Sequence, residues 1–302
     1  MFPGETRARM RRAGRREVRR EWERLQGNPY RRLLFALRAK YLREAITITP
    51  LVNRTFLELG PGPGRFTGVL GEQTRTLLLV DLSPKMLGEA RRRIAPGSPA
   101  VVHAIVADAA RLPVRSGRVG AAVALGNLVG FVEEELDWVL GEMTRVLAPG
   151  GLLVVEAVDG AVAGPRWVSP PSPSRLREAL SLPTLEGSMK RLLCEGWTEA
   201  PSPSANGRSP HHFPATELRR RFLQLGLQVT APRWVAPLTG SLPDLVNEVG
   251  RDPVLFQRML ALEETAGRDP GSSRSRGPYL LTAISRASGG TSDGPSRGGH
   301  RT

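Results

Sequence analysis

The sequence predicts an α/β fold in which helices cover both faces of a mainly parallel, doubly wound sheet. Between residues 55 and 158, five strand-like runs alternate with helix-like runs, and this alternation is typical of a parallel sheet. The strand-like runs are almost wholly apolar, as expected for strands that are buried on both faces. A chain of 302 residues can bury a core of this size without disulfides or metals.

Two helices are expected before the sheet. Residues 6–25 place apolar side chains at helical spacing among arginines, and residues 27–29 (Gly-Asn-Pro) break the pattern. A second helix is expected over residues 30–45, with an apolar face formed by Leu34, Leu37, Tyr41 and Ala45. This face indicates that the second helix packs on the main sheet.

Five strands and three helices make up the centre of the chain. The expected strands are Thr55–Leu59, Thr76–Asp81, Val101–Ala107, Gly120–Leu125 and Leu152–Val158. The expected helices are Arg65–Gly71, Lys85–Ile94 and Glu133–Leu147. The Pro-Gly-Gly run at 149–151 ends the last helix and turns the chain into the fifth strand.

The remaining chain divides into an insertion, a return to the sheet, and a tail. Residues 160–214 carry Pro/Ser-rich loops around two helical stretches, 175–180 and 185–195, and are expected to form a helical cap. Residues 215–286 return to regular structure. Their expected elements are a helix at 216–225, a sixth strand at 227–235, a helix at 253–266 and a seventh strand at 279–285. The Gly/Ser/Arg-rich residues 287–302 are expected to be disordered. The predicted divisions are thus 1–52, 53–159, 160–214, 215–286 and 287–302.

Charge is concentrated at the start of the chain. The net charge is +14, of which residues 1–43 carry +10 through 13 arginines and one lysine against four glutamates. A basic arm of this kind can bind nucleic acid, although arginine-rich solvated helices are also common. The single cysteine, Cys194, excludes an intramolecular disulfide and a cysteine-based zinc site, and it favours a cytoplasmic location. No apolar run approaches the length of a transmembrane segment.

A glycine-rich turn follows the first strand. Gly60, Gly62 and Gly64 lie between that strand and the next helix, where a backbone without side chains can approach a ligand closely. Three acids accompany the turn: Glu58 precedes it, Asp81 ends the second strand, and Asp108 follows the third. In open α/β sheets, ligands bind at these carboxyl ends of the strands, and an acid after the second strand can accept the hydroxyls of a ribose.

These motifs resemble those of the class I S-adenosylmethionine-dependent methyltransferases. The resemblance covers residues 54–158. It lies in the acid-x-Gly-x-Gly-x-Gly run at 58–64, the run Val-Asp-Leu-Ser-Pro at 80–84, Asp108 with the residues after it, and the run Arg-Val-Leu-Ala-Pro-Gly-Gly at 145–151. It implies a Rossmann-like sheet of seven strands in the order 3-2-1-4-5-7-6, with strand 7 antiparallel, and S-adenosylmethionine as cofactor.

The resemblance also implies which residues bind the cofactor. They are Glu58, Gly60, Gly62, Gly64, Asp81, Leu82, Asp108, Ala109, Leu125 and Gly126. No metal is implied. In such enzymes the cofactor carries the reactive group and the protein mainly orients the acceptor, so no universal catalytic residue is required. His211 and His212 are the candidate bases, and the alternative is that this pair is simply exposed in a Pro/Ser-rich loop.

Several functions remain open at this stage. The leading hypothesis is methyl transfer to a small molecule or a lipid-like acceptor. An RNA or protein methyltransferase that grips its partner with the basic arm is the alternative, and a non-catalytic module that retains the fold is the third. A dinucleotide-dependent dehydrogenase is disfavoured, because Arg65 and Thr67 stand where its Gly-x-Gly-x-x-Gly fingerprint needs a third glycine.

Overall fold

The computed structural model describes most of the chain between residues 27 and 285. The described residues are 27–51, 54–159, 166–167, 173–185, 187, 197–198, 213–239, 242–268 and 278–285. The expected helix at 6–25, most of the expected helix at 185–195, and the expected tail at 287–302 lie outside these residues. The domain divisions proposed from the sequence therefore stay a prediction.

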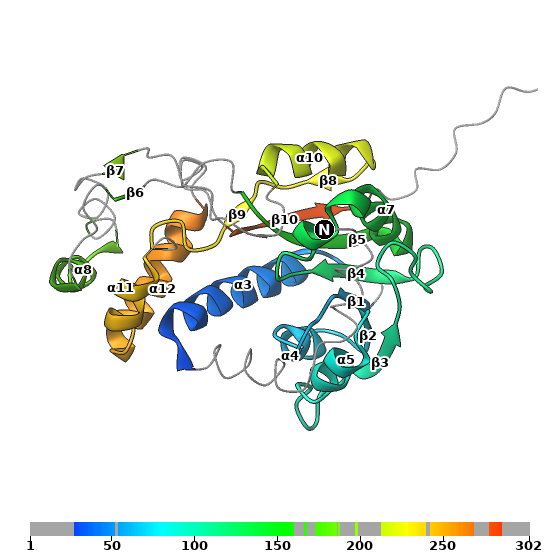
Figure 1. Ribbon diagram of the computed structural model, residues 1–302, viewed down its shortest axis with the longest axis horizontal. Coiled ribbons are helices and arrows are strands. Elements are labelled where there is room, and N and C mark those ends of the chain that lie inside the picture. Colours follow the sequence, from blue (N-terminus) through cyan, green and yellow to red (C-terminus); the bar gives the residue numbers. More distant parts are fainter. Residues whose placement is uncertain are drawn as a thin grey trace, which may run out of the picture.

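A single large sheet organises the structure (Figure 1). Its central strands are β1 (Thr55–Leu59), β2 (Thr76–Asp81), β3 (Val101–Val106), β4 (Val119–Ala124) and β5 (Leu147–Val158). These five are parallel to one another, while the final strand β10 (Pro278–Ile284) is antiparallel to β5. The order β3-β2-β1-β4-β5-β10-β8 confirms the predicted topology, with β10 in the place of strand 7.

The strand expected at 227–235 is divided into two short segments. β8 (Gln228–Val229) and β9 (Arg233–Trp234) both pair with β10, in antiparallel fashion. Pro232 lies between them. Because proline has no N–H to donate to a neighbouring strand, it explains why one continuous strand does not form here.

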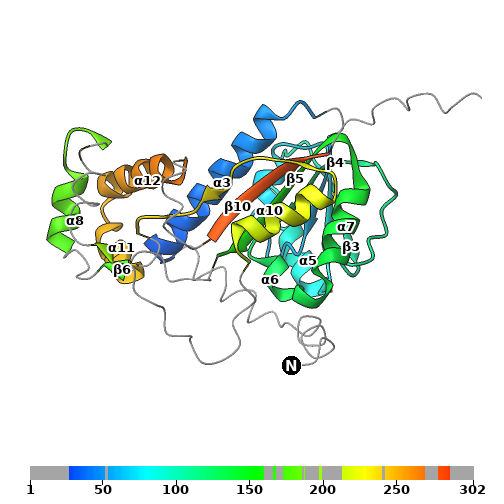
Figure 2. The same ribbon diagram turned by 90° about the horizontal axis from the view of Figure 1, so that it is seen from above.

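Helices cover the sheet on both faces (Figure 2). The helices of the main body are α3 (Pro29–Ile48), α4 (Thr67–Gly71), α5 (Pro84–Arg91), α6 (Leu128–Phe131), α7 (Leu136–Val146) and α10 (Ala215–Gln224). One apolar cluster joins α3, α4 and α5 to one face of the sheet, and a second joins α7 and α10 to the other. The alternating side chains of β5 serve both clusters: Val154 faces α3, and Val155 faces the second layer.

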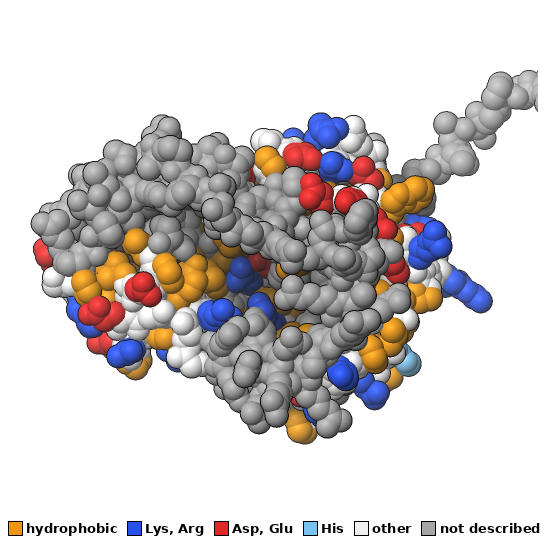
Figure 3. Space-filling model, viewed as in Figure 1, with side chains coloured by type: hydrophobic (Ala, Val, Ile, Leu, Met, Phe, Trp, Pro, Cys, Tyr) orange, Lys and Arg blue, Asp and Glu red, His pale blue; other side chains and the backbone are white. Residues whose placement is uncertain are grey.

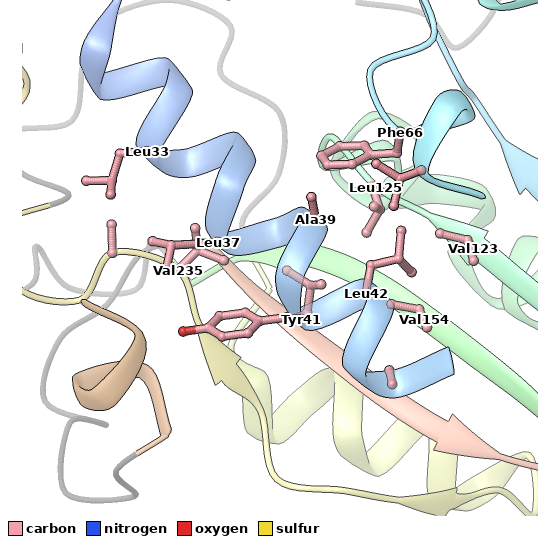
Figure 4. Close-up of a cluster of buried hydrophobic side chains, with 14 of the residues drawn as sticks. Leu33, Leu37, Ala39, Tyr41, Leu42, Phe66, Val123, Leu125, Val154 and Val235 are labelled. Atoms are coloured by element: carbon pink, nitrogen blue, oxygen red, sulfur yellow. The ribbon is translucent and has the colours of Figure 1, made fainter. Parts of the chain in front are cut away.

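The long helix α3 packs on the sheet as its apolar face predicts. Asn28 caps it by accepting a hydrogen bond from the Arg31 N–H (2.9 Å), and Pro29 occupies the first turn. Figure 4 shows Leu42 close to Val154 of β5, and Leu37 beside Val235. α3 is thereby held across the sheet and beside the glycine-rich turn.

Further helices form a lobe at one end of α3. α8 (Pro173–Leu180) packs against α11 (Pro243–Val249) and α12 (Pro253–Arg268), and both of these contact α3. α8 agrees with the helical stretch expected in the insertion. α11 was not expected from the sequence. Two short strands of the insertion, β6 (Arg166–Trp167) and β7 (Trp197–Thr198), pair with each other rather than with the main sheet.

The visible surface is divided in character. Figure 3 shows hydrophobic side chains over α11 and α12, and charged side chains of both signs over α10. None of the helices in the described part of the chain has the length and apolarity that crossing a bilayer requires.

Candidate cofactor site

The order of the strands places the predicted site residues in a row at one edge of the sheet. Asp108 follows β3, Asp81 ends β2, Gly60 follows β1 and Gly126 follows β4, and these four strands are neighbours in that order. Strands lie about 4.8 Å apart, so the row spans about 14 Å. An extended ligand with a base, a ribose and an amino-acid tail can lie along such a row.

The glycine-rich turn is shaped by contacts that exclude side chains. The Gly60 N–H donates to the Val80 carbonyl (2.8 Å), so the loop starts as an extension of the β1–β2 ladder. Gly64 has φ +85°, and a Cβ there would lie 2.6 Å from the Ala90 Cα of α5. Gly62 has φ +54°, and a Cβ there would meet nothing within 4 Å. Gly64 therefore serves packing, whereas Gly62 leaves open space over the turn.

Asp81 is tied to the glycine-rich turn. Its Oδ1 accepts a hydrogen bond from the Ser83 N–H (2.8 Å), and its Oδ2 accepts a long one from the Gly62 N–H (3.4 Å). Burial raises the pKa of this carboxyl, and the hydrogen bonds from the Ser83 and Gly62 N–H groups oppose that rise. The same Ser83 caps α5 through its hydroxyl, which accepts from the Met86 N–H. The acid lies at the end of β2, as the sequence predicted, and these hydrogen bonds hold it beside the loop.

Glu58 lies beneath the turn and is only 3% exposed. Its Oε2 accepts a hydrogen bond from the Thr67 hydroxyl (2.7 Å), at the start of α4. Burial raises the pKa of Glu58 to about 7, while the Thr67 hydrogen bond acts in the opposite direction. Glu58 can therefore change its charge near neutral pH, and a cation bound above it would favour the ionised form.

Asp108 organises the loop after β3. Its Oδ1 accepts from the Ala110 N–H (3.0 Å), and its carbonyl accepts from the Arg111 N–H (3.0 Å). These bonds close a tight turn and leave the carboxylate at the far end of the row. Ala109 and Leu82 are partly buried beside the acids that they follow.

The turn after β4 holds features that the sequence did not reveal. Gly126 and Asn127 both adopt left-handed backbone, with φ +73° and φ +59°. The Gly126 N–H donates to Oε2 of Glu156 on β5 (2.8 Å), and Oε1 of Glu156 accepts from Arg38 of α3. The one available signal was an acid within the otherwise apolar fifth strand. Arg38 gave no signal among the many arginines of the basic arm.

A pocket opens between α3, the two residues that follow the glycine-rich turn, and the turn after β4. It measures about 210 Å³, and its lining includes Phe35, Arg38, Phe66, Gly126 and Glu156. The rings of Phe35 and Phe66 stack with their centroids 5.4 Å apart. Figure 4 shows Phe66 and Leu125 facing α3 from the sheet side. The candidate bases His211 and His212 lie outside the described residues, so their relation to this pocket stays a prediction.

Two observations fit a ligand with hydrogen-bond donors at this edge. Asn127 is only 8% exposed, and its side-chain Oδ1 has no hydrogen-bond partner in the described part of the chain. A buried acceptor without a donor is costly unless a ligand or water supplies one. The open space over Gly62 gives such a ligand room, and the acids of the row can accept hydroxyl and amino groups. The residues present therefore fit S-adenosylmethionine, which carries donors of both kinds.

Comparison with known proteins gives a family for the centre of the chain. A family model described as a methyltransferase domain matches residues 56–151, which run from β1 to the beginning of β5. The solved structure of an S-adenosylmethionine-dependent methyltransferase from Leishmania major aligns with a TM-score of 0.50 and 14% identity. That alignment covers 93% of this chain and 82% of that one, and it supports the fold alone.

Two curated relatives match the same region at higher identity. Demethylmenaquinone methyltransferase from Thermus thermophilus is 34% identical over 128 residues, which cover 41% of this chain and 57% of that protein. Nodulation protein S from Rhizobium tropici is 29% identical over 133 residues, which cover 43% of this chain and 52% of that protein. The chain therefore spans about half the length of the curated relatives that it matches.

Proposed function

Because the chain contains a class I S-adenosylmethionine-dependent methyltransferase domain, we propose that it transfers a methyl group from that cofactor to a small-molecule or lipid-like acceptor. The observation that carries the proposal is the row of site residues along the strand ends, with Asp81 bonded to the glycine-rich turn. Demethylmenaquinone methyltransferase is named for a small lipid-like acceptor, which supports the acceptor class. The single cysteine favours a cytoplasmic location for the reaction.

Each part of the row would hold one part of the cofactor. Asp108, with Ala109, would meet the adenine, and Asp81, with Leu82, would accept the ribose hydroxyls. Glu58 and the turn of Gly60, Gly62 and Gly64 would face the amino-acid end. Leu125 and Gly126 would supply backbone groups there. When bound, S-adenosylmethionine would supply a methyl group already activated by its sulfonium.

The protein's own contribution to such a reaction is orientation and exclusion of water. The pocket beside α3 would hold the acceptor, with the stacked Phe35 and Phe66 rings as an apolar wall. We do not assign Glu156 as the base, because it is buried and its two oxygens are engaged by Arg38 and the Gly126 N–H. A base, where the acceptor needs one, would come from His211 or His212 or from the acceptor itself.

The direct test is calorimetric titration with S-adenosylmethionine. Wild-type protein should bind it, and Asp81→Ala should bind at least tenfold more weakly, because the ribose loses a charged acceptor. Asp244→Ala is the matched control, since Asp244 is exposed on α11. Absence of binding by the wild type, or equal binding by Asp81→Ala, contradicts the proposal. A methylation screen of cell-extract fractions with a labelled methyl donor then identifies the acceptor.

A second candidate is methylation of RNA or protein, for which the charge of the arm is the supporting observation. Residues 1–43 carry +10, and most of them precede the described helix α3. If the arm binds RNA, deletion of residues 1–28 should weaken binding and reduce its salt dependence. Equal RNA affinity of the full-length and deleted chains removes this candidate.

A further inference from the structure

A buried ion pair joins the N-terminal helix to the strand-end turn at the candidate site. Oε1 of Glu156 accepts hydrogen bonds from Nε (2.9 Å) and Nη2 (2.7 Å) of Arg38. Its Oε2 accepts from the Gly126 N–H (2.8 Å). Glu156 is 1% exposed, and the Arg38 side chain is 14% exposed. One carboxylate thus connects α3, β5 and the turn after β4.

Stability alone does not account for this pair. A buried ion pair contributes little more than an apolar pair of similar volume, because both charges must leave water. Apolar packing prevails around it: Leu37 and Leu42 of α3 and Val154 of β5 belong to the same buried cluster (Figure 4). The ion pair adds geometric specificity, because the directional hydrogen bonds of a guanidinium and a carboxylate fix the positions of the groups that they join.

The turn that Glu156 bonds is strained and needs such fixing. Asn127 holds φ +59°, a left-handed conformation that asparagine adopts more readily than other side chains but less readily than glycine. Conformations of this kind persist where their surroundings hold them. The Gly126 N–H is bonded to Glu156, while the neighbouring Asn127 presents its unpartnered Oδ1. Loss of Glu156 therefore frees the peptide between Leu125 and Gly126, directly before the left-handed pair Gly126 and Asn127.

The same residues line the pocket beside the glycine-rich turn. Arg38, Glu156 and Gly126 all contribute to its wall. A change in the ion pair therefore alters the position of α3 and the shape of the turn together. Both surfaces face the place where the amino-acid end of the cofactor would lie.

We propose that Glu156 is a positioning residue for the cofactor, acting through the Gly126 N–H, with Arg38 as the counter-ion that couples α3 to the same turn. This inference rests on the proposed function, because it takes the turn to be part of the cofactor site. Neither residue touches the reacting atoms. Their effect is on cofactor affinity, and through the packing of α3 on the shape of the acceptor pocket.

The test is calorimetric titration with S-adenosylhomocysteine, which keeps the amino-acid end of the cofactor. Glu156→Gln keeps the shape but cannot accept from both Arg38 and Gly126, so its affinity should fall about tenfold. Arg38→Met leaves Glu156 without its counter-ion and should produce a loss of similar size. The double variant should lose much less than the product of the two single losses, because both act through one interaction. Arg38→Lys should recover part of the affinity.

The matched control is Glu263→Gln. Glu263 is also fully buried, but it lies on α12 and accepts hydrogen bonds from Leu238 and Thr239 rather than from the turn after β4. All variants are titrated at a temperature where circular dichroism shows that they are folded. A purely structural role would lower the melting temperatures of Glu156→Gln and Arg38→Met and leave their affinities like that of Glu263→Gln. A positioning role lowers affinity in the Glu156 and Arg38 variants only.

The outcomes separate this inference from the proposed function. If wild-type protein binds no S-adenosylhomocysteine, the proposed function fails and the inference fails with it. If the wild type binds and both Glu156→Gln and Arg38→Met bind equally well, only the inference is overturned. The inference is also overturned if the fold-losses of affinity in the two single variants multiply in the double variant. Independent effects would mean that Arg38 and Glu156 do not act on the cofactor through one shared interaction.

Discussion

Replacement of Glu58 by glutamine should make stability less dependent on pH. Burial favours the protonated carboxyl, and the pKa rises from 4.5 to about 7, which corresponds to about 3 kcal/mol. The contribution of this group to stability is fully present below the unfolded-state pKa of 4.5 and is lost as the pH rises through 7. Glutamine resembles the protonated form and can still accept from the Thr67 hydroxyl, but it has no proton to lose.

Chemical unfolding at two pH values measures this difference. Glu58→Gln should gain about 2–3 kcal/mol of unfolding free energy relative to wild type between about pH 5 and about pH 8. The comparison must be made as a difference between the two proteins, because burial also raises the pKa of Glu263 to about 7. Parallel stability curves for the two proteins would refute the assigned cause.

The same variant tests whether Glu58 faces the cofactor. A bound ammonium would favour ionised Glu58, so binding of S-adenosylhomocysteine near pH 7 should release a proton from the wild type. Calorimetry in two buffers with different ionisation enthalpies detects that proton. The release should disappear in Glu58→Gln and persist in Glu263→Gln. If the release is unchanged in Glu58→Gln, Glu58 does not face the cofactor.

Three other changes have outcomes that the structure specifies. Gly64→Ala should lower the free energy of unfolding in urea by about 2–3 kcal/mol, because the new Cβ would lie 2.6 Å from the Ala90 Cα. A decrease below about 1 kcal/mol would contradict that close approach. Asn127→Gly should raise stability by about 0.5–1 kcal/mol through relief of its positive φ, while affinity for S-adenosylhomocysteine falls; a simultaneous gain in both would show that Oδ1 binds no ligand. Arg145→Met should remove the hydrogen bonds to the Leu112 and Val114 carbonyls and thereby speed amide hydrogen exchange between residues 112 and 116. Unchanged exchange would mean that other contacts hold that loop.

The sheet could be read from the sequence because its strands are short apolar runs with clear ends. The first four predicted parallel strands lie within one residue of their observed positions, and Asp81 falls at the end of β2 as expected. The fifth was expected to begin at Leu152 but begins at Leu147, so the Pro-Gly-Gly run that was expected to precede it lies within β5. The strand at 227–235 was less predictable, because apolar content alone does not show how a proline interrupts pairing. The helix α11 was missed because its seven residues are too few to show a periodic pattern.

The positions of the candidate site residues in the fold were predictable where they depend on the end of a strand, while their role in cofactor binding stays a prediction. The glycines and acids of the row depend on the local turn and on the strand order, and both leave a pattern in sequence. The Arg38–Glu156 pair depends on packing between segments separated by 118 residues, so no local sequence pattern predicts it. The orphaned Oδ1 of Asn127 is likewise visible only once the surrounding atoms are placed.

The placement of β10 between β5 and β8 has a consequence for synthesis of the chain. β5 is central in the finished sheet, yet its partner on one side is Pro278–Ile284, which pairs with residues 152–158. During translation, one edge of β5 therefore stays unpaired until the ribosome has made more than 100 further residues, which include the insertion at 160–214. Exposed apolar edges of this kind promote aggregation of nascent chains. Protein truncated before residue 278 should accordingly be recovered in inclusion bodies rather than as a weaker enzyme.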